Sequence, residues 1–319
     1  MSTEKICVVG CSGFIGSHVT AELLARGYDV NGTLRNAAGE SAEWLMSGVA
    51  AAASGNNRLK LYSADAFDKA SFAAPMQDCN GVIVSAGSPA VEPETIDLMA
   101  AIAENISEAA IDAGVGRAVF TSSTGSTNPP EGEPELKNEV DHWSDDALQL
   151  EQKKYAAVGK TRLDRTVLQK MHDSNGTFRV STINPTMIIG PSYKPKPEGS
   201  FERFAAIIRG ERFTDKIPNS SLSYIDARDL AALHANALEK EDASGRYFGV
   251  KASWHWRDIL GALERVYPAY EAPLWDPDVE PARATQFDLF RQNTLGVNVR
   301  GLDEMLKSFI SELKRREMI

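Results

Sequence analysis

The chain has 319 residues, 43% of them hydrophobic, so it can form one large globular domain or a domain with a smaller companion. Its formal net charge of -10 argues against partners such as nucleic acid or an anionic membrane surface. Neither the cysteines (Cys7, Cys11, Cys79) nor the five histidines show metal-ligand spacing, so we expect reduced thiols, no metal site and a cytoplasmic location. We expect no signal peptide, because the N-terminus passes almost directly into an apolar run, and no apolar run approaches the about 18 residues of a membrane span.

Short apolar, β-branched runs alternate with segments of helical periodicity through the first half of the chain. This alternation is typical of a parallel sheet covered by helices, so the sequence predicts an α/β fold with a Rossmann-type doubly wound sheet. We expect strands at 6–9, 29–33, 59–62, 81–85, 117–121 and 179–183, and helices near 14–27, 40–53, 68–76, 93–114 and 150–174.

Beyond about residue 185 the pattern becomes irregular, because prolines interrupt it and aromatic residues cluster near 254–270. We expect 1–185 to be mainly dinucleotide-binding. Residues 186–319 are expected to form mainly a small substrate lobe, with some returning sheet elements, over the edge of the sheet where such folds bind ligands. His255 either lines a substrate pocket or packs the lobe. The acidic stretch from Glu131 to Asp146 is expected to be a solvated surface.

A glycine-rich turn follows the first predicted strand, in the order Gly10-Cys11-Ser12-Gly13-Phe14-Ile15-Gly16. Glycines at such positions allow a tight turn and a close approach of the backbone to a pyrophosphate, and the next helix presents its positive N-terminus. The strand, turn, helix and second strand occur in the proper order. The sequence therefore predicts a dinucleotide site here.

The second predicted strand ends at Arg35, where an NAD-specific site would usually carry an acidic residue for the ribose 2′-hydroxyl. A guanidinium suits a 2′-phosphate, which favours NADP(H) over NAD(H). Asp65, after the third strand, is a candidate acceptor for the adenine amino group, or simply a surface turn residue.

Lys160 lies four residues after Ala156 in the sequence Lys154-Tyr155-Ala156-Ala157-Val158-Gly159-Lys160. Residues four apart share one face of a helix, so a phenol at 156 would stand beside the lysine ammonium, which would lower its pKa and make it a proton donor near neutral pH. That phenol is absent. Tyr155 is five residues from Lys160, about 140° around a helix, and is expected to point elsewhere.

The chain resembles the extended short-chain dehydrogenase/reductase superfamily and, within it, the dihydroflavonol reductase and cinnamoyl-CoA reductase group. The resemblance covers nearly the whole chain and implies reduction of a ketone or aldehyde by NADPH. Its motifs are Gly10 to Gly16, Val119-Phe-Thr-Ser-Ser-Thr-Gly-Ser-Thr-Asn128, Trp143-Ser-Asp145, Val158-Gly-Lys-Thr161, Ile183-Asn-Pro-Thr186 with Gly190-Pro191, and Tyr224-Ile-Asp226 with Asp229.

This resemblance implies that Ser123 polarises the substrate carbonyl, and that Lys160 binds the nicotinamide ribose and tunes a phenol whose position falls at Ala156. Helices 93–114 and 150–174 would pair in a homodimer, as in relatives. Expected substrate contacts are Asn128 and Tyr155. Expected cofactor contacts are Gly10, Ser12, Gly13, Phe14, Ile15, Gly16, Arg35, Asp65, Ala66, Ser85, Ala86, Lys160, Pro185 and Thr186.

Ala156 leaves three interpretations open. The chain is a tyrosine-to-alanine variant of a reductase, or an enzyme that uses Tyr155 or water as the acid, or a nucleotide-binding protein without redox turnover, such as a sensor of the NADPH/NADP ratio. The loops carry no residue pattern that names the substrate beyond a small carbonyl compound.

Overall fold

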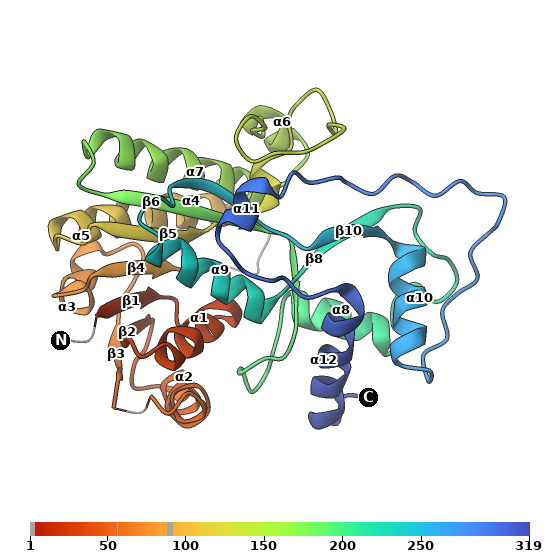
Figure 1. Ribbon diagram of the computed structural model, residues 1–319, viewed down its shortest axis with the longest axis horizontal. Helices are drawn as coiled ribbons and strands as arrows, with labels where there is room; N and C mark the ends of the chain where they lie inside the picture. The colour runs from red at the N-terminus through yellow and green to blue at the C-terminus, as the bar shows by residue number, and fades with distance from the viewer. Residues whose placement is uncertain (1–3, 56, 88–91) are drawn as a thin grey trace.

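The computed structural model describes residues 4–55, 57–87 and 92–319, and within these it shows a seven-stranded parallel sheet beside a three-stranded one (Figure 1). The large sheet has the order β3-β2-β1-β4-β5-β6-β9. The order reverses between β1 and β4, and ligands of doubly wound folds bind at that switch point, beyond the carboxyl ends of the strands. The strands are β1 (Lys5–Val9), β2 (Asp29–Leu34), β3 (Leu59–Ser63), β4 (Gly81–Val84), β5 (Arg117–Thr121), β6 (Arg179–Pro185) and β9 (Gly245–Gly249).

Both faces of this sheet are buried, because successive side chains of each strand enter opposite layers. In β1, Ile6 and Val8 belong to one core, and Cys7 and Val9 to the other. The first core includes α1 (Phe14–Ala25), α2 (Glu40–Trp44), the π-helical stretch η1 (Leu45–Ala50) and α9 (Ala227–Glu239). The second includes η2 (Lys69–Phe72), α3 (Ala73–Met76), α4 (Glu94–Ala101), η3 (Ile102–Ile106), α5 (Ser107–Asp112) and α7 (Tyr155–Asp173). The predicted Rossmann-type α/β fold is confirmed.

The C-terminal half builds a lobe with its own core and returns β9 to the large sheet. The lobe's sheet has the order β10-β8-β7, from β7 (Met187–Ile189), β8 (Ser221–Asp226) and β10 (Ala252–His255). Its helices are α8 (Ser200–Ile208), α10 (Trp256–Val266) and α12 (Leu302–Arg315), while α11 (Phe290–Thr294) packs on β9. No helix in the described ranges is long and apolar enough to cross a membrane.

His255 packs the lobe. Its ring is buried, accepts the backbone N–H of Arg257 at 3.1 Å to begin α10, lies 3.0 Å from Asn219 Oδ1, and contacts Trp275 edge-on. Of the two interpretations of this histidine, the structure therefore favours packing.

The single helix expected over 150–174 is wrong in its first turn. The short helix α6 (Asp146–Glu151), capped by the Asp145 carboxylate, ends before Lys153, whose φ of 54° lies in the left-handed region that interrupts a right-handed helix. The long helix α7 begins only at Tyr155. Ala156 and Lys160 therefore both lie in the first two turns of α7.

The expectation of a solvated acidic loop at 131–146 is also partly wrong. Lys137, Glu139 and Ser144 are buried in it. The backbone of Lys137 bonds to the 286–288 segment at both its N–H and its carbonyl, and burial raises the pKa of the Glu139 carboxyl. The loop therefore belongs to the body of the protein.

Candidate cofactor and catalytic site

The glycine-rich turn lies at the switch point of the sheet. Gly10 has a φ of 80°, and a Cβ added there would lie 2.8 Å from backbone atoms of Ala86, two residues past the end of β4. A Cβ on Gly16 would lie 2.0 Å from the Gly10 carbonyl oxygen. Both positions require glycine, as expected for a backbone that must approach a pyrophosphate.

The start of α1 faces this turn and has no side-chain cap at Gly13. Its first backbone N–H groups therefore remain available to an anion, and the helix dipole favours negative charge there. Ser85 adjoins the turn from β4, with its hydroxyl donating to the Val9 carbonyl at 3.3 Å. Ser12 and Phe14 are half-buried and Ile15 is buried. These contacts fit a dinucleotide cradle.

Arg35 and Asp65 follow the neighbouring strands β2 and β3, which pair Leu34 with Ser63 at this edge. The Arg35 side chain is exposed and forms no ion pair with any described residue, so it is available to a phosphate. Asp65 Oδ1 accepts the backbone N–H of Phe67 at 2.9 Å, and the Ala66 carbonyl accepts from Asn105 at 2.9 Å. The turn after β3 is thus held by a hydrogen bond of its own and by one from η3.

Ser123 and Lys160 reach the same edge from β5 and α7. The Ser123 hydroxyl oxygen accepts the Gly125 N–H at 3.0 Å and begins the short 3₁₀ turn η4 (Thr124–Ser126). The Lys160 ammonium donates to the Thr121 carbonyl at 2.6 Å, at the end of β5. A Cβ on Gly125 would lie 3.2 Å from the Ala157 Cβ, so η4 packs directly on the first turn of α7.

Burial lowers the pKa of the Lys160 ammonium to about 8, a shift that the charge of Asp164 opposes.

His234 of α9 is buried beside the end of β5. Its Nδ1 lies 2.7 Å from the Leu230 carbonyl oxygen, and its Nε2 lies 2.7 Å from the Thr121 hydroxyl oxygen. Because a carbonyl only accepts, Nδ1 carries the proton, and Nε2 accepts from Thr121. Burial lowers the pKa of His234 to about 4, so the ring is neutral at pH 7.

Ala156 lies one helical turn before Lys160 and is half-buried, while Tyr155 opens the helix. Among the described residues the Tyr155 hydroxyl has no hydrogen-bond partner. Positions 156 and 160 lie one turn apart in α7, as the predicted pairing of a phenol at 156 with Lys160 requires. The role of this pairing in catalysis, in preference to a role for Tyr155, stays a prediction.

The other expected site residues occupy the same side of the sheet. The Asn128 side-chain oxygen accepts from the buried Lys137 ammonium at 2.7 Å, and its backbone N–H donates to the Ser144 hydroxyl at 2.8 Å. Pro185 ends β6, opposite Gly249 of β9. The Thr186 hydroxyl donates to the Ser223 carbonyl at 2.8 Å, which ties the end of β6 to the lobe.

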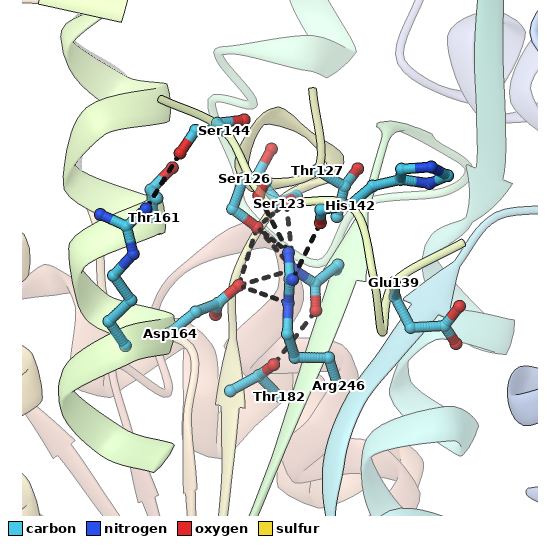
Figure 2. Close-up of polar contacts among 12 residues, drawn as sticks. Ser123, Ser126, Thr127, Glu139, His142, Ser144, Thr161, Asp164, Thr182 and Arg246 are labelled. Carbon is cyan, nitrogen blue, oxygen red and sulfur yellow. Dashed lines mark hydrogen bonds and ion pairs between the residues drawn. The ribbon is translucent and has the colours of Figure 1, made fainter. Parts of the chain in front are cut away.

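A buried polar cluster under η4 was not foreseen from the sequence. It contains Asp164, Arg246 and Ser126 (Figure 2), together with Asn184, whose amide lies 2.9 Å from the Asp164 carboxylate. The spacing of Asp164, one turn after Lys160, could have suggested that both face the same loop. No local pattern pointed to Arg246.

The fold and these contacts define a dinucleotide-binding α/β protein with a serine and a lysine placed together at the switch-point edge. The comparisons agree: the NAD dependent epimerase/dehydratase family matches residues 6–250, and this chain belongs to that family. It is 30% identical to cinnamoyl-CoA reductase 1 of Oryza sativa subsp. japonica, over 96% of this chain and 89% of that protein.

Solved structures share the fold over the whole length. Vestitone reductase from alfalfa (Medicago sativa) superposes with a TM-score of 0.83 at 24% identity, over 99% of each chain. Yeast methylglyoxal/isovaleraldehyde reductase Gre2, complexed with NADPH, superposes with a TM-score of 0.82 at 23% identity, over 99% of this chain and 100% of that one. The predicted membership of the reductase group is confirmed, and with it a nicotinamide cofactor at the level of the family.

Proposed function

We propose that this chain is an NADPH-dependent reductase of a ketone or aldehyde, with turnover weakened by Ala156. The observation that carries the proposal is the joint placement of the glycine cradle, Ser123 and Lys160 at one edge of the sheet. The names of the relatives, a cinnamoyl-CoA reductase and a vestitone reductase, support the reaction class.

In this proposal Ser123 donates its hydroxyl hydrogen to the substrate carbonyl oxygen, since its own oxygen already accepts from Gly125. Held by the glycine turn and the N-terminus of α1, a reduced nicotinamide cofactor would supply the hydride for the carbonyl carbon. Lys160 binds the ribose and places a positive charge near the oxygen, which gains the electron pair. The proton then comes from water beside Ala156, because no phenol is present there. Water is a poor acid, so a slow reaction is expected.

Arg35 supports NADPH rather than NADH. Its guanidinium is exposed at the end of β2 and is free of ion pairs within the described chain, so it can pair with a 2′-phosphate. Yeast Gre2 was solved with NADPH. Roles for the remaining glycine-turn and strand-end residues follow the same proposal.

The substrate body is proposed to enter a cavity of about 380 Å³ in the lobe, a size typical of small-molecule sites. Met187, directly after Thr186, lines it, so the cavity begins beside the expected nicotinamide loop. Most of the other lining side chains are aromatic or aliphatic: Phe204, Ile207, Phe213, Leu222, Tyr224 and Trp256, with Arg203 and Arg212 at exposed positions. An aryl carbonyl compound fits this lining.

The test is NADPH consumption by the full chain with a panel of aryl aldehydes and ketones, some carrying a carboxylate. We expect slow turnover that Ser123→Ala lowers by about 10²-fold. The alternative, an NADP(H)-sensing protein without turnover, is favoured by the single missing phenol. Tight NADPH binding with no reduction of any compound, even after a tyrosine is restored at 156, would establish that alternative.

The proposal also includes an oligomeric state and a cellular location. A homodimer through α4 and α7, which pack together in the monomer, would show twice the chain mass in light scattering. A cytoplasmic location fits three cysteines that are all free and buried. A monomer in solution, or localisation of a tagged chain outside the cytoplasm, would contradict these aspects.

A further inference from the structure

A buried ion pair lies directly under the turn that carries Ser123. Asp164 on α7 is 0% exposed and Arg246 on β9 is 4% exposed, and the guanidinium Nε lies 3.3 Å from the carboxylate Oδ2 (Figure 2). Taking two charges out of water is costly, and well-packed apolar residues often give equal or greater stability. Stability alone therefore does not account for the pair.

The pair, together with Asn184, holds η4 at Ser123 and Ser126. Arg246 Nη2 donates to the Ser126 carbonyl at 2.9 Å, and the Ser126 hydroxyl donates to Asp164 Oδ2 at 2.7 Å. Asn184 Nδ2 lies 2.9 Å from the same carboxylate oxygen and 3.1 Å from the Ser123 carbonyl, with donor geometry to both. The Ser126 carbonyl thus accepts from Arg246, besides the Ser144 N–H at 3.0 Å, and the Ser123 carbonyl accepts from the Asn184 amide that Asp164 also binds. Apolar side chains could not replace these contacts.

Arg246 also fixes the segment that covers the turn. Its guanidinium lies 3.7 Å from the centre of the Trp143 ring, and its Nη1 donates to the His142 carbonyl at 3.1 Å. The next residue, Ser144, donates its hydroxyl to the Gly125 carbonyl at 2.8 Å. The backbone of η4 is therefore held by Arg246 and Asn184, which both contact Asp164, and by the 142–144 segment.

The direction of the Ser123 hydroxyl depends on this backbone, since its oxygen accepts from the N–H of Gly125, in the middle of the held turn. We propose that Asp164 and Arg246 are positioning residues, which act through the backbone of η4 to aim the Ser123 hydroxyl at the substrate carbonyl. This inference rests on the proposed reductase function. Neither residue is proposed to touch substrate or cofactor.

The first test needs no turnover. In Asp164→Asn, amide hydrogen exchange of residues 122–127 should rise, while the strands of the large sheet keep their protection. Glu312→Gln is the matched control, because Glu312 is also a buried carboxylate paired with arginines, Arg315 and Arg316, but in α12. Unchanged exchange at 122–127 in Asp164→Asn would overturn the positioning role. If that variant does not fold, Ser126→Ala, which removes one donor to Asp164, replaces it with the same expectation.

The second test is a double-mutant cycle with Ser123→Ala, measured as kcat and as NADPH affinity. Misplacing a catalytic group by about 1 Å can cost on the order of 10²-fold, so Asp164→Asn should lower kcat by about that factor and leave NADPH affinity unchanged. In the Ser123→Ala background it should add little, because the group that it positions is gone. An equal loss in both backgrounds would refute action through Ser123.

Arg246→Lys keeps the charge beside Asp164 but loses the planar fork that reaches two carbonyls, so its loss of kcat should be smaller than that of Arg246→Met. Equal losses in the two variants would contradict the proposal. The two proposals can fail separately. If exchange at 122–127 rises in Asp164→Asn but the parent chain reduces no carbonyl compound, the support of the turn by Asp164 is confirmed and the proposed reductase function is wrong.

Discussion

Restoring the missing phenol is the sharpest test of the site. In Ala156→Tyr the new side chain would stand one helical turn before Lys160, whose ammonium is fixed by the Thr121 carbonyl at 2.6 Å. Ala156 is only half-buried and lies in the first turn of α7, so a larger side chain can enter from the open side. The variant should therefore fold as the parent does and gain a proton donor next to an existing cation.

The expected gain in carbonyl reduction is about 10²–10⁴-fold, the usual contribution of a positioned general acid, or about 3–5 kcal/mol of the barrier. The lysine pKa of about 8 means that about nine in ten ammonium groups are charged at pH 7. The gain should thus be nearly complete at pH 7. It should shrink as the pH rises above about 8, where Lys160 loses its proton and no longer favours the phenolate.

The assay follows NADPH consumption with a panel of aryl aldehydes and ketones from pH 6 to about 9, chosen to bracket the lysine pKa of about 8. Ala156→Phe is the matched control, because it adds the same ring without the hydroxyl, and it should show no gain. NADPH affinity should be unchanged in both variants. A similar gain in both would show a packing effect. No gain from tyrosine, with a parent that turns over briskly, would refute the idea of a lost catalytic phenol.

Arg35→Ala should reduce the preference for NADPH over NADH about tenfold or more, measured by fluorescence titration, and an unchanged preference would remove Arg35 from the cofactor site. Gly16→Ala places a Cβ 2.0 Å from a backbone oxygen and should weaken NADPH binding about tenfold or more, whereas Gly48→Ala, with nothing within 4 Å, should not. The pKa of His234 is about 4 in the folded chain against an ordinary 6.5, so the unfolded chain takes up the proton first. The free energy of unfolding should therefore fall by up to about 3 kcal/mol for this residue as the pH drops from about 6.5 to about 4. Denaturant titrations of His234→Gln should show a shallower pH dependence, and those of the exposed His172→Gln should match the parent; equal slopes in all three would contradict the reasoning.

The sequence allowed prediction of those features that local patterns determine. The strands of the large sheet up to β6, and the glycine turn, follow from runs of a few residues whose periodicity and backbone needs are visible without a partner. The break in the helix at Lys153 was missed, because a left-handed lysine has no signature of its own. The three-residue strand β7 was missed because it is too short to show a period.

Within the candidate site, the residues after β1, β4 and β5 were predicted from the sequence, and their roles stay a prediction. Lys137, Glu139 and Arg246 were not, since each is buried by segments distant in sequence, and a charged residue in a loop or strand is ordinarily solvated. The 104 positions between Arg246 and its acceptor at His142 illustrate the difficulty. Such pairings depend on the arrangement of the sheet rather than on any local pattern.

The place of Arg246 in the chain has a consequence for biosynthesis. The turn that carries Ser123 leaves the ribosome early, but Arg246, whose side chain donates to the Ser126 carbonyl, follows 120 positions after Ser126. During vectorial synthesis the glycine turn and the first strands can assemble while the Ser126 carbonyl of η4 still lacks its hydrogen bond from Arg246. Nascent chains that stop before β9 should therefore keep η4 open to proteases, and ordering of the reactive centre should coincide with release of the last quarter of the polypeptide.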